Sequence, residues 1–338
     1  MLIRKAILST VALFGSGIPI RSLIKMTCRN VIFPFYHAVS DSSLTHIHHL
    51  YHPKTTKQFI TDLDFLLKNY SPMDINEVIS FRDSNKKRSK PGFFLSFDDG
   101  LKEFYEIIAP ILLKKGIPAA CFLNSGFVDN KDLFYRYKAS LLCDYFLKEK
   151  KDYDHPKVKD WVKNHQNNRP EKILLSLPYQ KKEEIDTLAS LVGLDFKSYL
   201  AVQKPYMTTE QIKELSSQGF YFGAHSLDHP MYANISTSEQ IRQTELSLRW
   251  PSENLAQKYS LFAFPFSDVG VKSSFYKQFE NIDLIFGTAG LKDTVLKNHF
   301  QRIPMEFADY SGENIIKAEY LYYMLKSLVG KNNFSGYD

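Results

Sequence analysis

The sequence predicts an α/β fold built on a parallel sheet, and three observations support this prediction. Residues 93–97 form a mostly apolar run, as expected for a strand that is buried on both faces. Residues 219–224 form a second run of the same kind. Between residues 93 and 123, a strand pattern, a helix pattern and another strand pattern follow one another. This alternation is typical of a parallel α/β architecture.

The N-terminal residues 1–28 are predicted to be separate from the main domain, which we expect over residues 29–338. Arg4 and Lys5 precede a mostly apolar stretch, as in a signal peptide, but no small-residue cleavage site follows. The stretch is also too short and too interrupted by glycine and proline for a transmembrane helix. We therefore expect an uncleaved amphipathic segment that packs on the domain or lies on a membrane surface. The expected location is cytoplasmic or peripheral to the cytoplasmic membrane; if residues 1–20 act as a signal, the protein is instead secreted or periplasmic.

The composition is that of an ordinary globular protein, with 338 residues, 44% hydrophobic and 24% charged. The formal net charge is +6, but the basic residues are dispersed and form no stripe with interleaved aromatic residues. We therefore expect no nucleic-acid partner. The three cysteines, Cys28, Cys121 and Cys143, are odd in number and far apart, which argues against a disulfide framework and against a cysteine metal site.

Hydrophobic periodicity places the other elements along the chain. Strand patterns occur at residues 31–37, 119–123, 259–264, 282–286 and 300–305. Helix patterns occur at residues 55–70, 73–81, 101–115, 208–217, 236–250 and 313–329. The alternation breaks at residues 129–205, where the sequence is helical and charged, without a convincing strand. We expect a helical insertion there, which either forms a lid or substrate-guiding wall or packs away from the substrate.

Two adjacent carboxylates, Asp98 and Asp99, follow the strand at 93–97 directly and precede Gly100. Neighbouring carboxylates repel and are costly to bury, so they add nothing to a core. A metal site can use both, because one carboxylate binds the cation and the other acts on the water that the cation holds. The alternative is a strand-to-helix turn in which one Asp caps the helix that begins near Leu101.

Two histidines, His225 and His229, follow the strand at 219–224. Their i, i+4 spacing predicts that they lie on one side of a helical turn, from which both imidazoles can reach one ion. With Asp99 they form a set of two histidines and one carboxylate with open positions, which suits a hydrolytic zinc site.

These motifs resemble those of the polysaccharide deacetylases, the carbohydrate esterases with NodB homology. Ser96 to Gly100 and His225 to His229 supply two of the family's motifs, and 262–267 (Phe-Ala-Phe-Pro-Phe-Ser) supplies a third. The third motif is similar to the Phe-Ala-Tyr-Pro-Phe-Gly variant of the deacetylases of extracellular poly-N-acetylglucosamine. The resemblance spans residues 31–306 and implies a distorted (β/α)7-8 barrel with a helical insertion and an N-terminal helix.

The resemblance also implies residue roles. Asp99, His225 and His229 are expected to hold one divalent ion, most simply Zn²⁺, and Asp98 is expected to be the general base. The backbone N–H of Phe266 is expected to stabilise the oxyanion. The implied activity is removal of acetyl groups from N-acetylglucosamine-type poly- or oligosaccharides, so the expected partner is a carbohydrate.

The sequence departs from the family pattern in two places. Many relatives have an arginine that orients the base at the position of Ala263, and Arg302 could replace it from another strand. The family's last motif, Leu-x-His, supplies a general acid, and this motif is absent. His299 and Glu306 are the nearest candidates for that acid. Without an acid, an O-acetyl esterase or a non-catalytic carbohydrate-binding protein are the alternative functions.

Further histidines lie near the first strand. His37 ends the strand pattern at 31–37 and is expected either to support the site or to make a structural hydrogen bond. His46, His48, His49 and His52 follow in the next loop, and such tracts can bind metal. No cysteine or carboxylate stands among them, which favours a solvated loop at the rim of the site.

Overall fold

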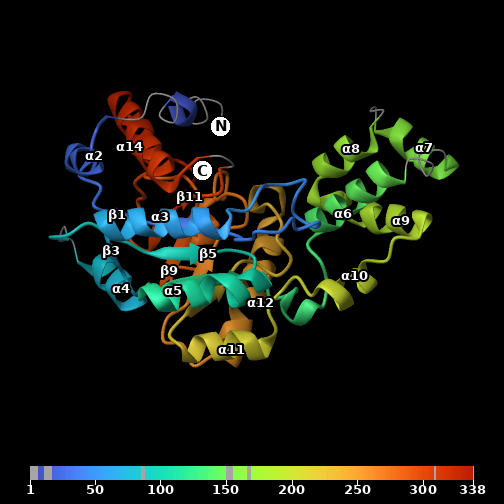
Figure 1. The fold of residues 1–338 in the computed structure, drawn as a ribbon, viewed down its shortest axis with the longest axis horizontal. Helices are drawn as coiled ribbons and strands as arrows, with labels where there is room; N and C mark the ends of the chain where they lie inside the picture. Colours follow the sequence, from blue (N-terminus) through green and yellow to red (C-terminus); the bar gives the residue numbers. More distant parts are fainter. Residues whose placement is uncertain are drawn as a thin grey trace.

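The computed structural model describes residues 7–10, 17–84, 88–149, 155–165, 169–307 and 310–337 (Figure 1). Its main sheet has eight strands, all paired in parallel. In spatial order these strands are β10 (His299–Gln301), β9 (Leu284–Gly287), β8 (Leu261–Ala263), β7 (Tyr221–Ala224), β6 (Ala119–Leu123), β5 (Leu95–Phe97), β2 (Pro34–Tyr36) and β11 (Ile303–Pro304).

The two outer strands of this order, β10 and β11, are consecutive in the chain and are separated by Arg302 alone. β10 pairs with β9, whereas β11 pairs with β2. The sheet therefore returns on itself and forms a nearly closed barrel, which confirms the predicted distorted (β/α)7-8 fold. At the break, the N–H of Arg302 donates to the carbonyl of Gly287 and the N–H of Ile303 donates to that of Phe33.

A small parallel sheet extends two of the barrel strands at their N-terminal ends. It contains β1 (Val31–Ile32), β4 (Gly92–Phe93) and β3 (Ser71–Pro72), in that order. The predicted strands at 31–37 and 93–97 therefore each divide into two short strands that belong to different sheets.

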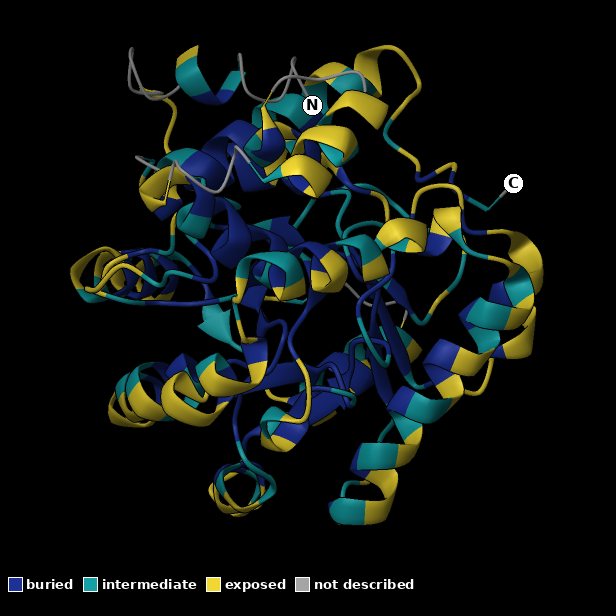
Figure 2. Ribbon diagram, turned by 90° about the vertical axis from the view of Figure 1, so that its right-hand side faces the viewer, coloured by how far each residue is buried: buried dark blue, intermediate teal, exposed yellow. Residues whose placement is uncertain are grey.

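Helices surround the barrel and turn their buried sides toward it (Figure 2). They are α3 (Thr56–Asn69), α4 (Ile75–Asp83), the π-helical turn η1 (Phe104–Ile108), α5 (Ala109–Lys115), α11 (Thr209–Ser217), α12 (Thr237–Asn254), α13 (Ser273–Gln278) and α14 (Gly312–Leu328). Side-chain caps mark several of their starts, because Thr55, Asp74 and Thr208 each form a capping box. These start positions explain why the sequence located the helices well.

A group of helices stands beside the barrel between β6 and α11 (Figure 1). After the short turn η2 (Val128–Asn130), it comprises α6 (Tyr135–Lys148), α7 (Pro156–Asn164), α8 (Pro170–Ser176), η4 (Tyr179–Lys181), α9 (Glu183–Val192) and α10 (Phe196–Gln203). These helices share an apolar cluster of their own with the loop that follows β2. We call them the helical insertion.

The short helix α2 (Ile20–Thr27) packs beside α14, with Ile20, Leu23 and Ile24 buried. Among the described residues, no helix has both the length and the apolar character needed to cross a membrane. Residues 1–6 and 11–16 of the predicted N-terminal segment at residues 1–28, on which the signal-peptide and membrane-surface alternatives rest, lie outside the described residues.

Candidate active site

One end of the barrel carries a cavity of about 300 Å³. His37, Asp98 and His225 line it, and each follows the last residue of a strand, β2, β5 and β7 respectively. Because the strands are parallel, their carboxyl ends meet at this end of the barrel, where barrel enzymes place their catalytic groups. Asp99, His229 and Phe266 line the same cavity.

Asp99, His225 and His229 converge on one point. The Nε2 atom of His229 lies 3.3 Å from Oδ1 of Asp99, and the Nε2 atom of His225 lies 3.7 Å from the same oxygen. All three residues are buried. Asp99 Oδ1 and His225 Nε2 have no hydrogen-bond partner among the described residues. Buried polar atoms without partners are costly, and a cation between them would remove that cost. The three side chains therefore fit a divalent metal ion.

The local backbone at these residues differs from the predicted helical turn. His225–His229 is an irregular loop, in which Ser226 has a φ of 67° and His229 a φ of 63°. Asp99 has a φ of 73°. Non-glycine residues in this left-handed region are strained, and such strain concentrates at functional sites. The prediction of a helix was therefore wrong, and left-handed turns bring the two imidazoles together instead.

Two hydrogen bonds orient the side chains of His225 and Asp99. His225 Nδ1 lies 2.8 Å from the carbonyl oxygen of Ala263, so this nitrogen carries the proton and leaves Nε2 free to bind an ion. The hydroxyl of Tyr137, on α6, donates to Oδ2 of Asp99 at 2.8 Å. Burial lowers the pKa of His225 to about 4, so its ring is neutral at physiological pH.

Asp98 forms a bidentate ion pair with Arg302. Nη1 and Nη2 of the guanidinium lie 2.7 Å and 2.8 Å from the two carboxylate oxygens, and both residues are buried. Burial by itself opposes ionisation, but the permanently charged Arg302 guanidinium outweighs it and holds the pKa of Asp98 below its usual value. Asp98 is therefore ionised and fixed in orientation. Ser96 and the aromatic ring of Phe35 contact the same guanidinium.

His37 faces the cavity and is paired with Glu306, which follows β11. Nδ1 of His37 is hydrogen-bonded to Oε2 of Glu306, and Oε1 accepts from the backbone N–H groups of His37 and Ala38. Burial lowers the pKa of His37, but the neighbouring Glu306 carboxylate outweighs this effect and raises it to about 9. His37 is therefore protonated at neutral pH, as a general acid must be.

The other candidate for the acid, His299, lies outside this arrangement. It is fully buried, with Nε2 3.0 Å from a carboxylate oxygen of Asp268 and Nδ1 3.0 Å from the hydroxyl of Tyr337. It is not among the residues that line the cavity. Because β10 begins at His299, the residue lies at the opposite end of its strand from the site.

Phe266 lines the cavity in a left-handed conformation, with a φ of 57°. Its ring packs against the imidazole of His229, with 4.6 Å between the ring centroids. Its carbonyl oxygen accepts a hydrogen bond from the hydroxyl of Thr288 at 3.0 Å. The structure thus fixes the backbone of this residue beside His229.

The helical insertion contributes residues that the sequence did not identify. Phe134, Arg136 and Tyr137, at the start of α6, line the cavity. Lys182 of the insertion donates to Asp228 of the His225–His229 loop at 2.6 Å, and Tyr179 donates to the same carboxylate. The insertion is therefore a wall of the site. The aromatic and basic composition of residues 134–137 is the one signal in the sequence that could have indicated this.

Solved structures show the same fold. The chain is similar to the Streptococcus pyogenes deacetylase PplD in complex with acetate, with a TM-score of 0.54, 16% identity, and coverage of 86% of this chain and 97% of that one. For IcaB from Ammonifex degensii the values are 0.52, 15%, 86% and 97%. For a de-N-acetylase from Aggregatibacter actinomycetemcomitans they are 0.51, 15%, 84% and 99%. A search of curated protein sequences gave no match.

The family assignment comes from the sequence itself. Residues 85–280, more than half of the chain, match the polysaccharide deacetylase family. This range contains the paired aspartates, the two histidines and the Phe266 motif, and the barrel is the fold that the resemblance predicted. The chain belongs to the polysaccharide deacetylase family and is a deacetylase of the hydrolase class.

Proposed function

We propose that the protein hydrolyses the N-acetyl groups of N-acetylglucosamine-type poly- or oligosaccharides with the help of one divalent ion, most simply Zn²⁺. One observation supports this most directly: an ionised carboxylate, Asp98, and a protonated imidazole, His37, line the same cavity as the ligand set of Asp99, His225 and His229. Amide hydrolysis needs this combination, because a base must activate water and an acid must protonate the leaving nitrogen.

The bound ion would polarise the acetyl carbonyl and make the attacking water more acidic. Asp98 accepts the proton of that water, and Arg302 keeps the carboxylate ionised and oriented while it does so. The water oxygen bonds to the carbonyl carbon, and the backbone N–H of Phe266 donates toward the oxygen that becomes negative. The carbon–nitrogen bond then breaks as His37 gives its proton to the departing amine. The products are acetate and a free amino sugar.

The His37–Glu306 pair also bears on the alternative of an O-acetyl esterase. The absence of the Leu-x-His acid favours that alternative, because an ester leaving group needs less protonation by an acid than an amine does. A histidine whose pKa is raised to about 9 provides that protonation. It therefore favours the amide substrate.

The test is acetate release from chitooligosaccharides by purified, zinc-loaded protein, compared with hydrolysis of p-nitrophenyl acetate. We expect acetate from the oligosaccharides, and a loss of about 10²–10⁴-fold in Asp98→Asn. Zinc content measured on the same sample shows that the variant still binds the ion. Undiminished acetate release by Asp98→Asn would contradict the mechanism, and turnover of the ester alone would favour the esterase.

A further inference from the structure

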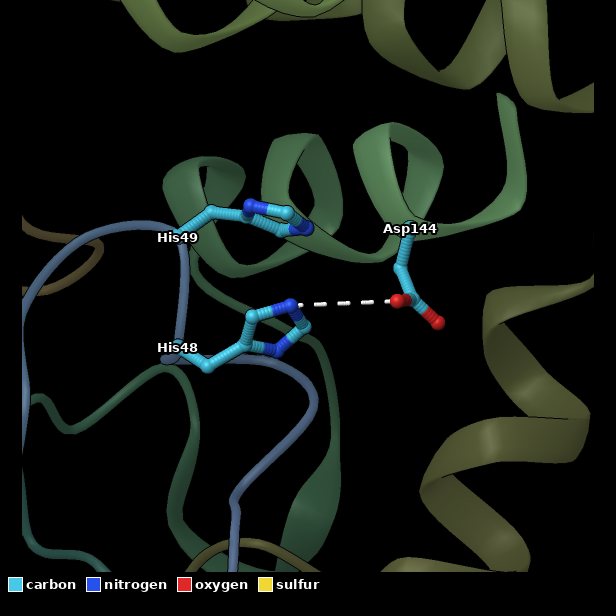
Figure 3. A group of neighbouring side chains, drawn as sticks. All are labelled: His48, His49 and Asp144. Atoms are coloured by element: carbon cyan, nitrogen blue, oxygen red, sulfur yellow. Dashed lines mark ion pairs between the residues drawn. The ribbon is translucent and has the colours of Figure 1, made fainter. Parts of the chain in front are cut away.

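A second group of metal-binding side chains lies outside the catalytic cavity. His48 and His49 belong to the loop between β2 and α3, and Asp144 belongs to α6 of the helical insertion. One ligand atom from each residue lies within 4.8 Å of the others, the same limit that encloses Asp99, His225 and His229. The two imidazoles face Asp144 across the space between loop and helix (Figure 3). The nearest pair is His48 Nε2 and Asp144 Oδ1, at 3.7 Å.

The hydrogen bonding of these residues leaves ligand atoms available. His48 Nδ1 and His49 Nε2 are shielded from solvent and have no hydrogen-bond partner in the part of the chain that the structure describes. The two rings lie only 3.9 Å apart between centroids. Asp144 uses Oδ2 to accept a hydrogen bond from Lys148 at 2.6 Å, and its Oδ1 faces His48. His48 meets Asp144 through Nε2, whereas the buried Nε2 of His49 lacks a hydrogen-bond partner in this part of the chain, and a cation held by the three side chains would supply one.

The chemistry of the ligands defines the class of ion. Two imidazoles and one carboxylate suit a first-row transition cation such as Zn²⁺ and do not suit Ca²⁺ or Mg²⁺, which prefer oxygen ligands. Glu171 of α8 lies close enough to interact electrostatically with His49, which adds negative charge to the site. Water can complete the coordination.

The position of the group suggests what an ion would do there. Tyr51, two residues after His49, lines the catalytic cavity, and so does Tyr137 of α6. The loop and α6 already touch, because the hydroxyl of Ser140 donates to the carbonyl of Thr45 at 3.1 Å. An ion held by His48, His49 and Asp144 would cross-link these two walls of the cavity.

We propose that His48, His49 and Asp144 form a second, structural site for a zinc-type divalent cation, which fastens the loop after β2 to the helical insertion. The proposal does not depend on the substrate or mechanism proposed above.

The test measures zinc bound to the full-length protein. Samples are stripped with chelator and dialysed against buffered Zn²⁺, and the metal is measured by mass spectrometry. We expect about two zinc ions per chain in the wild type and about one in His225→Ala, which breaks the catalytic ligand set. In that background, His49→Ala or Asp144→Asn should abolish the remaining zinc. His52→Ala is the matched control, because His52 is an exposed histidine of the same loop outside the group, and it should keep the remaining zinc.

Thermal melting provides a second readout and shows that each variant is folded. Zinc should raise the melting temperature of His225→Ala and should not raise that of His225→Ala/His49→Ala. The proposal is overturned if His225→Ala binds no zinc, or if the zinc bound to His225→Ala survives both His49→Ala and Asp144→Asn. Because these measurements do not involve acetate release, they fail or succeed independently of the proposed deacetylation.

Discussion

Arg302 holds Asp98 through both carboxylate oxygens, at 2.7 Å and 2.8 Å, from the break between β10 and β11. Relatives are expected to place an orienting arginine at the position that Ala263 occupies here, and Ala263 instead accepts a hydrogen bond from His225. The guanidinium thus reaches the carboxylate from a different strand. Here the buried guanidinium of Arg302 fixes the carboxylate and keeps it ionised.

Replacing Arg302 should impair catalysis more than metal binding. Arg302→Lys keeps the positive charge but loses the bidentate hydrogen bonding to both carboxylate oxygens of Asp98. We therefore expect kcat to fall about 10²-fold. The acid limb of the pH–rate profile should move to higher pH, because burial is then less well opposed and the pKa of Asp98 rises. Steady-state kinetics across pH, with zinc content measured in parallel, tests this. An unchanged pH profile would show that Arg302 does not lower the pKa of Asp98.

Replacing Glu306 should move the alkaline limb of activity. Glu306 raises the pKa of His37 to about 9, so the protonated acid persists up to that pH and is lost above it. Glu306→Gln removes the largest contribution that opposes burial and leaves the weaker ones of Asp99 and Asp98, so we expect the alkaline limb of kcat/KM, measured across pH, to move to lower pH. The stability that the pair contributes is present below the unfolded pKa of about 6.5 and disappears as the pH rises through about 9.

His37→Gln is the companion of that variant. It should lower kcat on the amide substrate by about 10²–10⁴-fold and should affect an activated ester less, because the ester needs little protonation of its leaving group. Equal losses on amide and ester would argue that His37 positions the substrate and does not act as the acid.

Tyr137→Phe should weaken metal binding. Its hydroxyl donates to Asp99 Oδ2, and loss of such an outer partner typically costs 10–100-fold in metal affinity, in order of magnitude. Activity at low free zinc should fall accordingly and recover at high zinc. Tyr145→Phe is the matched control, because Tyr145 lies on the same helix and its hydroxyl bonds to the carbonyl of Val192. Equal zinc affinity in the two variants would contradict the assignment.

Glu103→Gln should stabilise the protein at neutral and alkaline pH. Burial raises the pKa of Glu103 from 4.5 to about 7. The unfolding free energy therefore falls as the pH rises from about 4.5 through about 7, and the loss persists above that. At about 1.4 kcal/mol per pKa unit, the loss is on the order of 3 kcal/mol. Denaturant unfolding at pH 5 and pH 8 should show this decline in the wild type and a smaller one in the variant.

The barrel was expected from the resemblance to the polysaccharide deacetylases, whereas the strands, the helices and the motifs were predicted from local patterns in the sequence. Buried strands are apolar runs, the helices begin at capping residues, and the paired Asp98 and Asp99 directly follow a strand. The positions of the elements were accurate to a few residues, as for the strand at 119–123, which is β6. These features need no knowledge of which segments meet in space.

The parts that depend on distant contacts were not predictable in the same way. The local geometry of His225 and His229 comes from left-handed residues, which the i, i+4 spacing did not indicate. The hydrogen bond from Tyr137 to Asp99 forms because the helical insertion packs against the cavity, which local patterns do not reveal. The pairing of His37 with Glu306 joins residues from opposite ends of the chain, and neither residue alone carries a signal that reveals the other.

The interrupted strand at Arg302 has a consequence for how the chain can be connected. Because β11 pairs with β2, the first and last strands are neighbours, and a new pair of termini could be opened elsewhere in the ring without separating the catalytic groups. The order of the catalytic residues around the barrel therefore does not depend on which strand the chain begins with. Circularly permuted forms of this enzyme should accordingly retain the site.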